Sequence, residues 1–163
     1  MSTHAINKYW LFRKCGIEVQ WVDASSQYIS AKVKMGVMEF FVYFVYASYD
    51  SIGRRELWQS LNNFFPGNMA WFVAGDFNTI ADGWGKIGGV HFSSIAMQDF
   101  NSFISSNGLF DMVFASGRFT WCDNGKTSMR IWSRIDCCLC NIQCLDSYHQ
   151  MLISHLPRTL SHH

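Results

Sequence analysis

Apolar and polar residues alternate in two stretches near the start of the chain, residues 17–22 and residues 29–35, as expected for half-buried β-strands. Residues 39–46 are almost entirely apolar or aromatic, which predicts a central strand covered on both faces. Turn-forming residues separate the three stretches, at positions 24–27 and 35–36. We therefore predict an antiparallel meander of three strands.

Two later stretches have the spacing of amphipathic helices. The first begins at a capping residue, Asp50 or Ser51, repeats apolar residues at helical spacing and ends before Pro66. The second covers residues 94–106, with aromatic residues on one face and Gly108 as its C-terminal stop. A buried strand and three short strands complete the pattern, at residues 71–74, 109–113, 119–122 and 130–138.

The buried strand ends in a polar pair. After the bulky residues 71–73, Gly75 permits close backbone approach, and Asp76 and Asn78 follow at strand spacing, which predicts that both point to one side. A charge at the end of a buried strand is costly unless it is paired, ligated or used in chemistry. Asp76 and Asn78 are therefore candidate site residues, although Asp and Asn also favour a simple strand-ending turn.

The length and the lack of an internal repeat or linker indicate one domain over residues 1–163, and the predicted elements give it mixed helix and sheet. The net charge of +1 gives no broad electrostatic footprint for nucleic acid, so any such binding would depend on a local patch. Charged residues make up only 15% of the chain, which suggests missing sequence, a partner or poor solubility. No oligomeric state follows from the sequence.

The chain shows neither a secretory signal nor an apolar stretch long enough to span a bilayer. We expect an intracellular protein, nuclear or cytoplasmic, with reduced cysteines and no membrane partner. Four cysteines within residues 137–144 invite a zinc interpretation. Their spacing is not that of paired Cys-x₂-Cys knuckles, and Cys137 and Cys138 would point to opposite strand faces, so we expect small buried side chains instead.

Seven motifs follow one another along nearly the whole chain. They are Val-Tyr-Ala-Ser (45–48), Arg-Arg-Glu-Leu-Trp (54–58), Gly-Asp-Phe-Asn (75–78), Lys-Ile-Gly-Gly (86–89), Phe-Thr-Trp (119–121), Arg-Ile-Trp-Ser-Arg-Ile-Asp (130–136) and His-Leu-Pro-Arg-Thr-Leu-Ser-His-His (155–163). In this order they resemble the endonuclease domain of plant LINE-type (non-LTR) retrotransposons, within the DNase-I-like endonuclease/exonuclease/phosphatase superfamily. One such motif would be weak, but seven in register are specific.

The resemblance implies an α/β (α+β) four-layer sandwich, in which two packed, mostly antiparallel β-sheets are flanked by helices. The family's first strands, which carry an asparagine and a metal-binding glutamate, and its last core strand have no counterpart here. We therefore expect an incomplete sandwich, a single partial domain over residues 1–163 that is truncated at both ends. The implied reaction is hydrolysis of DNA phosphodiesters with Mg²⁺ or Mn²⁺, a hydrolase activity with DNA as partner.

The resemblance also assigns roles to five residues. Asp76 matches the aspartate that orients or deprotonates the attacking water, and it would also be the metal ligand. Asn78 matches the amide that holds the scissile phosphate, and Tyr46 matches a tyrosine that bonds phosphate or assists the leaving group. Asp136 matches the aspartate that pairs with the catalytic histidine, here His163.

Other residues in the motifs leave alternatives open. Thr120 can reach phosphate, although two flanking aromatic residues are also typical of a buried strand. Asp136 could instead form a surface ion pair with Arg134. Arg54 and Arg55 at a helix start predict a solvated face, with phosphate contact as the alternative.

Two departures from the family pattern weaken the expected metal site. His162 stands where the family has an aspartate, and an imidazole cannot supply negative charge to a hard cation. Tyr49 stands where an asparagine is expected after Tyr46. We therefore expect the ancestral activity to be weakened or lost, and the alternative is a catalytically inactive retroelement remnant or a domesticated binding module.

Overall fold

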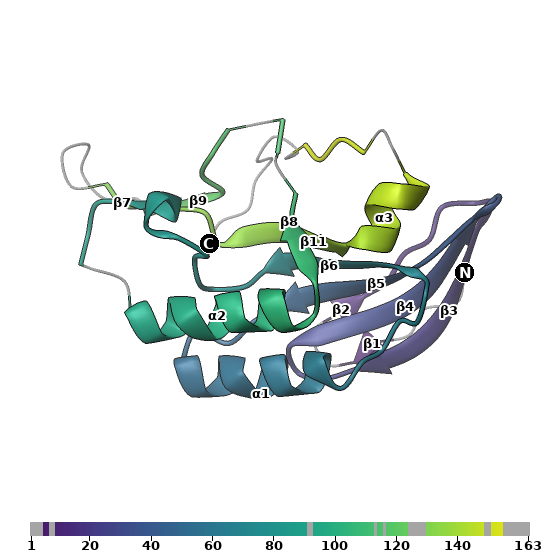
Figure 1. Ribbon diagram of the computed structural model, residues 1–163, viewed down its shortest axis with the longest axis horizontal. Coiled ribbons are helices and arrows are strands. Elements are labelled where there is room, and N and C mark those ends of the chain that lie inside the picture. Colours follow the sequence, from purple (N-terminus) through teal and green to yellow (C-terminus); the bar gives the residue numbers. More distant parts are fainter. Residues whose placement is uncertain are drawn as a thin grey trace.

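The computed structural model describes residues 5–6, 9–90, 93–112, 114–115, 117–123, 130–148 and 151–154 (Figure 1). The elements in chain order are β1 (Ala5–Ile6), β2 (Tyr9–Trp10), β3 (Ile17–Ala24), β4 (Tyr28–Met35), β5 (Met38–Tyr46), α1 (Ser51–Asn62), β6 (Ala70–Asp76), the short 3₁₀ helix η1 (Gly83–Gly85), β7 (Lys86–Ile87), α2 (Ser94–Ser106), β8 (Leu109–Asp111), β9 (Trp121–Cys122), β10 (Trp132–Ser133), β11 (Asp136–Asn141) and α3 (Ile142–Ser147).

A six-stranded sheet with the order β3-β4-β5-β6-β11-β8 forms the centre of the molecule. The predicted meander is confirmed, because β3, β4 and β5 pair antiparallel in sequence. The chain then crosses over through α1, and β6 pairs parallel with β5, as a helical crossover requires. β11 returns antiparallel to β6 and places β8 at the far edge. A three-stranded sheet, β7-β10-β9, lies beyond the end of this sheet.

α1 and α2 lie side by side against one face of the large sheet (Figure 1). The predicted cap of the first helix is confirmed, because the Asp50 side chain accepts from the Gly53 amide at 2.7 Å. Ser93, which the sequence did not single out, caps α2. The Trp58 ring of α1 stacks on two rings of α2, at 5.2 Å from Phe100 and 4.9 Å from Phe103. This aromatic layer and the sheet residues beneath it form the main core.

The opposite face is covered unevenly, which corrects one expectation about β5. α3 packs on this face, where buried Cys144 contributes to a small cluster with Phe40 and Phe72. Farther along the same face of β5, Phe44 and Tyr46 are 42% and 40% exposed. β5 is therefore covered on both faces only along its first half.

The predicted strand over residues 130–138 divides into two. β10 belongs to the small sheet and β11 to the large one, and between them the Arg134 amide bonds to the Gly85 carbonyl at 2.8 Å. The strands at residues 119–122 and 109–113 are also shorter than predicted, since β9 and β8 cover two and three residues. Apolar alternation indicates extended backbone, but it does not say which sheet receives each part.

The predicted fold class is confirmed, as the described residues form an α+β fold with a mixed six-stranded sheet, a three-stranded sheet and flanking helices. Among the described residues, every helix is too short or too polar to cross a membrane.

Candidate active site

Three predicted site residues meet at one end of the large sheet. Tyr46 ends β5, Asp76 ends β6, and Asp136 begins the antiparallel β11. Tyr46 is the register partner of Asp76 on one side, and Asp136 is its partner on the other. Register partners on neighbouring strands present their side chains on the same face, about 5 Å apart at Cβ. The fold therefore brings a phenol and two carboxyl groups together from positions 90 residues apart in sequence.

Gly75 makes the close approach of β5 and β6 possible just before Asp76. Its φ is +140°, and a Cβ at this position would lie 2.0 Å from the Val45 carbonyl oxygen. Only glycine avoids both the steric clash and the backbone strain.

Asn78 reaches the site by a turn, and not by strand spacing as predicted. β6 ends at Asp76, whose Oδ1 accepts from the Asn78 amide at 2.8 Å. Asn78 then adopts a left-handed conformation, with φ of 48°, which Asn tolerates better than most residues. Its Nδ2 donates to the Ala47 carbonyl at 2.7 Å. The strand-ending turn is therefore present, and it directs the amide toward the end of β5.

The surroundings of Asp76 favour its neutral form. Burial raises the pKa of Asp76 to about 6, the hydrogen bond from the Asn78 amide lowers it, and the negative charge of Asp136 raises it. Within the described residues, neither carboxylate forms an ion pair with Lys or Arg. Two adjacent carboxyl groups without a basic partner attract a cation or share protons.

Tyr46 makes a polar contact with Tyr49, the residue that replaces the expected asparagine. The two hydroxyl oxygens are 3.1 Å apart, and this hydrogen bond is the main cause that raises the pKa of Tyr46, followed by burial. Tyr46 is therefore protonated at neutral pH and can donate a hydrogen bond to an anion.

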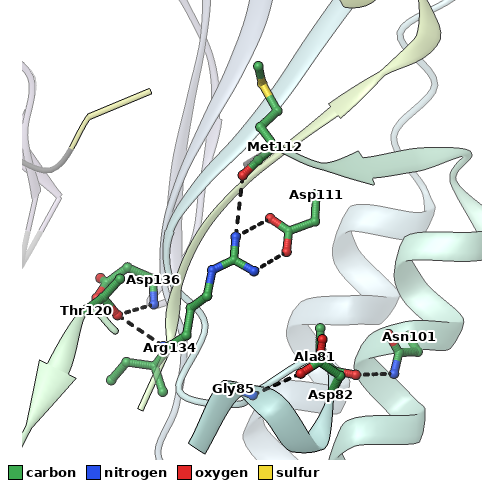
Figure 2. A network of polar contacts seen from close by, with 10 residues as sticks. Ala81, Asp82, Gly85, Asn101, Asp111, Met112, Thr120, Arg134 and Asp136 are labelled. Atoms are coloured by element: carbon green, nitrogen blue, oxygen red, sulfur yellow. Dashed lines mark hydrogen bonds and ion pairs between the residues drawn. The ribbon is translucent and has the colours of Figure 1, made fainter. Parts of the chain in front are cut away.

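Thr120 lies beside Asp136 (Figure 2). Its Oγ1 accepts from the backbone amides of Ile135 and Asp136, each at 3.1 Å. Its hydroxyl faces the Ser133 carbonyl at 3.5 Å, which is a long hydrogen bond. The small sheet thus delivers a hydroxyl group to the end of β11.

The loop after Tyr46 is held by two side chains that the sequence did not identify in this role. Arg54 is buried, and its Nη1 donates to the carbonyls of Ser48 and Tyr49 at 3.0 and 2.7 Å. The prediction of a solvated face is therefore wrong for Arg54. Gln27 accepts from the Ser48 amide at 2.7 Å, and a glutamine in a turn carries no sequence signal for such a contact.

The alternative interpretation of Asp136, an ion pair with Arg134, does not apply. Arg134 instead makes a bidentate pair with Asp111, at 2.6 and 2.8 Å. Burial lowers the pKa of Arg134, but the hydrogen bond to the Asp111 carboxylate raises it, and the pKa is raised overall. Asp136 thus remains available to the site. His162 and His163 lie outside the described residues.

Three of the four cysteines within residues 137–144 are small core side chains, and Cys138 is partly exposed. Cys137, Cys140 and Cys144 are buried, and burial is the main cause that raises the pKa of Cys137 to about 12. Among the residues that the structure describes, no group of three or more His, Cys, Asp or Glu is placed to hold a metal ion.

Asp76 and Asp136 nevertheless suit a hard divalent cation in one respect. Mg²⁺ prefers oxygen ligands and is commonly bound by one or two carboxylates together with substrate phosphates and water. Two neighbouring carboxyl groups without a described basic partner provide that donor set. A complete protein cage is not required for this mode of binding.

No protein-family model matches the sequence, and no curated protein matches it. Comparison with solved structures shows a DNase-I-like fold. The endonuclease domain of TRAS1, a telomere-specific non-LTR retrotransposon, aligns over 83% of this chain and 70% of its own, with a TM-score of 0.53 and 15% identity.

Two other structures share the fold over a smaller part of their own length. A β-hairpin deletion mutant of the Staphylococcus aureus beta toxin has a TM-score of 0.52 and 14% identity, over 84% of this chain and 53% of the toxin. The 3′ phosphatase NExo from Neisseria, solved with product DNA hairpin, has a TM-score of 0.50 and 18% identity, over 78% of this chain and 58% of the phosphatase.

Proposed function

We propose that this chain derives from, and retains the core of, a divalent-metal-dependent DNA endonuclease of the retrotransposon type. The observation that carries the proposal is the register of Tyr46, Asp76 and Asp136 at the end of three neighbouring strands. The likeness of fold to the TRAS1 endonuclease domain supports the substrate class.

In this proposal each side chain has a separate task in phosphodiester hydrolysis. Asp76 orients the attacking water and accepts its proton. Asn78, fixed by its bond to the Ala47 carbonyl, directs its side-chain amide to the scissile phosphate. Tyr46 donates a hydrogen bond to a phosphate oxygen or to the leaving group. The Thr120 hydroxyl, whose hydrogen bond to the Ser133 carbonyl is long at 3.5 Å, can rotate to donate to phosphate instead.

Asp136 and His163 form the remaining proposed pair. A carboxylate that accepts from an imidazole fixes the ring and stabilises its charged form, which in turn stabilises negative charge on phosphate. His163 lies outside the described residues, so this pair rests on the sequence motif.

Asp76 would hold Mg²⁺ or Mn²⁺, with Asp136 beside it. The ion, when bound, would neutralise developing charge on phosphate. His162 at the position of an expected carboxylate predicts weak metal affinity, and therefore a low rate of DNA cleavage.

The proposal is tested by nicking of supercoiled plasmid in Mg²⁺, in Mn²⁺ and in EDTA. Asp76→Ala should lower the rate by about 10²–10³-fold, as loss of one electrostatic group does in other enzymes. Asp146→Ala, which removes an exposed carboxylate on α3, is the matched control and should nick at the wild-type rate. Wild-type nicking no faster than that of Asp76→Ala, together with retained DNA binding, would favour the non-catalytic binding module.

A further inference from the structure

A bidentate ion pair between Arg134 and Asp111 lies close to the start of β11, the strand end that carries Asp136 (Figure 2). Arg134 donates from Nη1 and Nη2 to the two carboxylate oxygens of Asp111 at 2.6 and 2.8 Å. Nη2 also lies 3.4 Å from the Met112 carbonyl, and the guanidinium stacks at 5.1 Å from the Phe114 ring centroid. About three quarters of each charged side chain is shielded from water, at 22% and 24% exposed. The Arg134 side chain is therefore held by the last residue of β8 and by residues that follow it.

The backbone of Arg134 is held from another element. Its amide donates to the Gly85 carbonyl at 2.8 Å, and the Gly85 amide donates to Asp82 Oδ1 at 2.9 Å. Asn101 of α2 donates to the neighbouring Ala81 carbonyl at 2.6 Å. The 3₁₀ turn and the end of β8 thus contact Arg134 directly, whereas α2 bonds to Ala81, before that turn (Figure 2).

Arg134 is two residues from Asp136, and the segment between them is bonded on both sides. The Ile135 carbonyl accepts from the Phe77 amide at 2.8 Å, directly after Asp76. Thr120 Oγ1 accepts from the Ile135 and Asp136 amides. A shift of Arg134 would therefore be passed to both carboxyl groups of the site.

We propose that Arg134 and Asp111 are positioning residues that act as a unit to set the place of Asp136 opposite Asp76. Their catalytic consequence rests on the proposed function, whereas their effect on the geometry of the strand end does not. Arg134 makes no contact with Asp136 through its side chain, and it acts through the backbone of residues 134–136.

The bidentate geometry gives the unit its specificity. A planar guanidinium matches both oxygens of a carboxylate, whereas the ammonium of lysine is a point charge on a flexible stem. Arg134→Lys therefore keeps the charge and loses the alignment. Asp111→Asn keeps the shape and loses the charge-assisted bonds. The exposed pair of Arg55 and Asp99, with 2.7 Å between Nε and Oδ2, joins α1 to α2 and offers a control in Arg55→Lys.

The first test is amide hydrogen exchange by NMR on the full chain. In Arg134→Lys and Asp111→Asn, the Asp136 and Phe77 amides should exchange at least about tenfold faster, because the strand end opens locally. Amides in the β4–β5 ladder should be unchanged, as should all these amides in Arg55→Lys. Unchanged exchange at Asp136 and Phe77, or a uniform loss of protection across the sheet, would overturn the proposal.

The second test is plasmid nicking under substrate variation. Arg134→Lys and Asp111→Asn should each lower kcat by about 10²-fold with little change in KM, as small misplacements of reacting groups do. The double variant should be no slower than the slower single variant, because the two residues act as one unit. Wild-type kcat in Arg134→Lys would overturn the positioning role. A wild type that does not nick above the Asp76→Ala background contradicts the proposed function alone, and hydrogen exchange still decides the positioning.

Discussion

Asp76 lies in surroundings unlike those of a surface carboxyl group, because it is half-buried beside a second carboxyl group, that of Asp136. Burial and the neighbouring Asp136 disfavour its ionised form, and the Asn78 amide only partly offsets them. The raised pKa is a cost to the folded protein at neutral pH. A cation at this place would remove that cost, which links the stability of the site to the metal that the proposed reaction uses.

We predict that Asp76 titrates near pH 6 in the metal-free protein. The folded pKa of about 6 lies above the ordinary value of 3.8, so the stabilising contribution of the protonated form is complete below about pH 4. It is lost as the pH rises through 6. Carbon NMR of labelled aspartate measures this titration, and Asp136→Asn should shift it to lower pH. Titration near 4 in the wild type would contradict the account.

The sequence identified Asp76 because a carboxylate at the end of a buried strand is costly unless it has a role. It did not predict the geometry of Asn78, because nothing in the pattern distinguishes continued strand from a left-handed turn at that residue. It gave no sign that Gln27 or Asp111 supports the site. These two residues contact positions 21 and 23 residues away, and such contacts exist only once the topology is known.

At the scale of elements, the packing of α1 on α2 determines how firmly the sheet is covered. The Phe100 side chain is fully buried, and its ring centroid lies 5.2 Å from that of Trp58 and 5.0 Å from that of Phe77. The site end of β6 lies directly before Phe77, so this aromatic layer supports the strand that carries Asp76.

Phe100→Ala should destabilise the protein by about 3–5 kcal/mol, because truncation of a buried phenylalanine removes apolar burial and leaves a cavity. Urea denaturation followed by tryptophan fluorescence measures the change. Ile95→Ala on the exposed side of α2 is the control, and its effect should stay within about 0.5 kcal/mol. A similar loss in both variants would show that the aromatic layer is not the main contact between α2 and the rest of the molecule.

Helices α1 and α2 and the three-stranded meander were predicted with nearly correct limits, because each follows one hydrophobic period along one face. The short helix α3 was not predicted. The segment 130–138 was predicted as one strand, and its sequence contains no Gly or Pro that would mark a break. The chain leaves the small sheet and enters the large one at Arg134 and Ile135. The Arg134 amide donates to the Gly85 carbonyl and the Ile135 amide to Thr120 Oγ1, and these bonds hold the backbone where it changes sheets. Those partners are distant in sequence.

At the scale of the molecule, ordered motifs and topology agree on a DNase-I-like fold. Identity to the solved structures is only 14–18%, so the agreement lies in the arrangement of strands and not in overall sequence. The arrangement matters for function because it sets Tyr46, Asp76 and Asp136 in register. The central claim of the proposal is that these residues form a single site.

A double-mutant cycle of plasmid nicking with Asp76→Asn and Asp136→Asn tests that claim most directly. If the two carboxyl groups serve one metal-dependent site, each single variant should lose about 10²–10³-fold in rate, and the double variant should be no slower than the slower single variant. Wild-type nicking by Asp136→Asn, or losses that multiply in the double variant, would contradict the account.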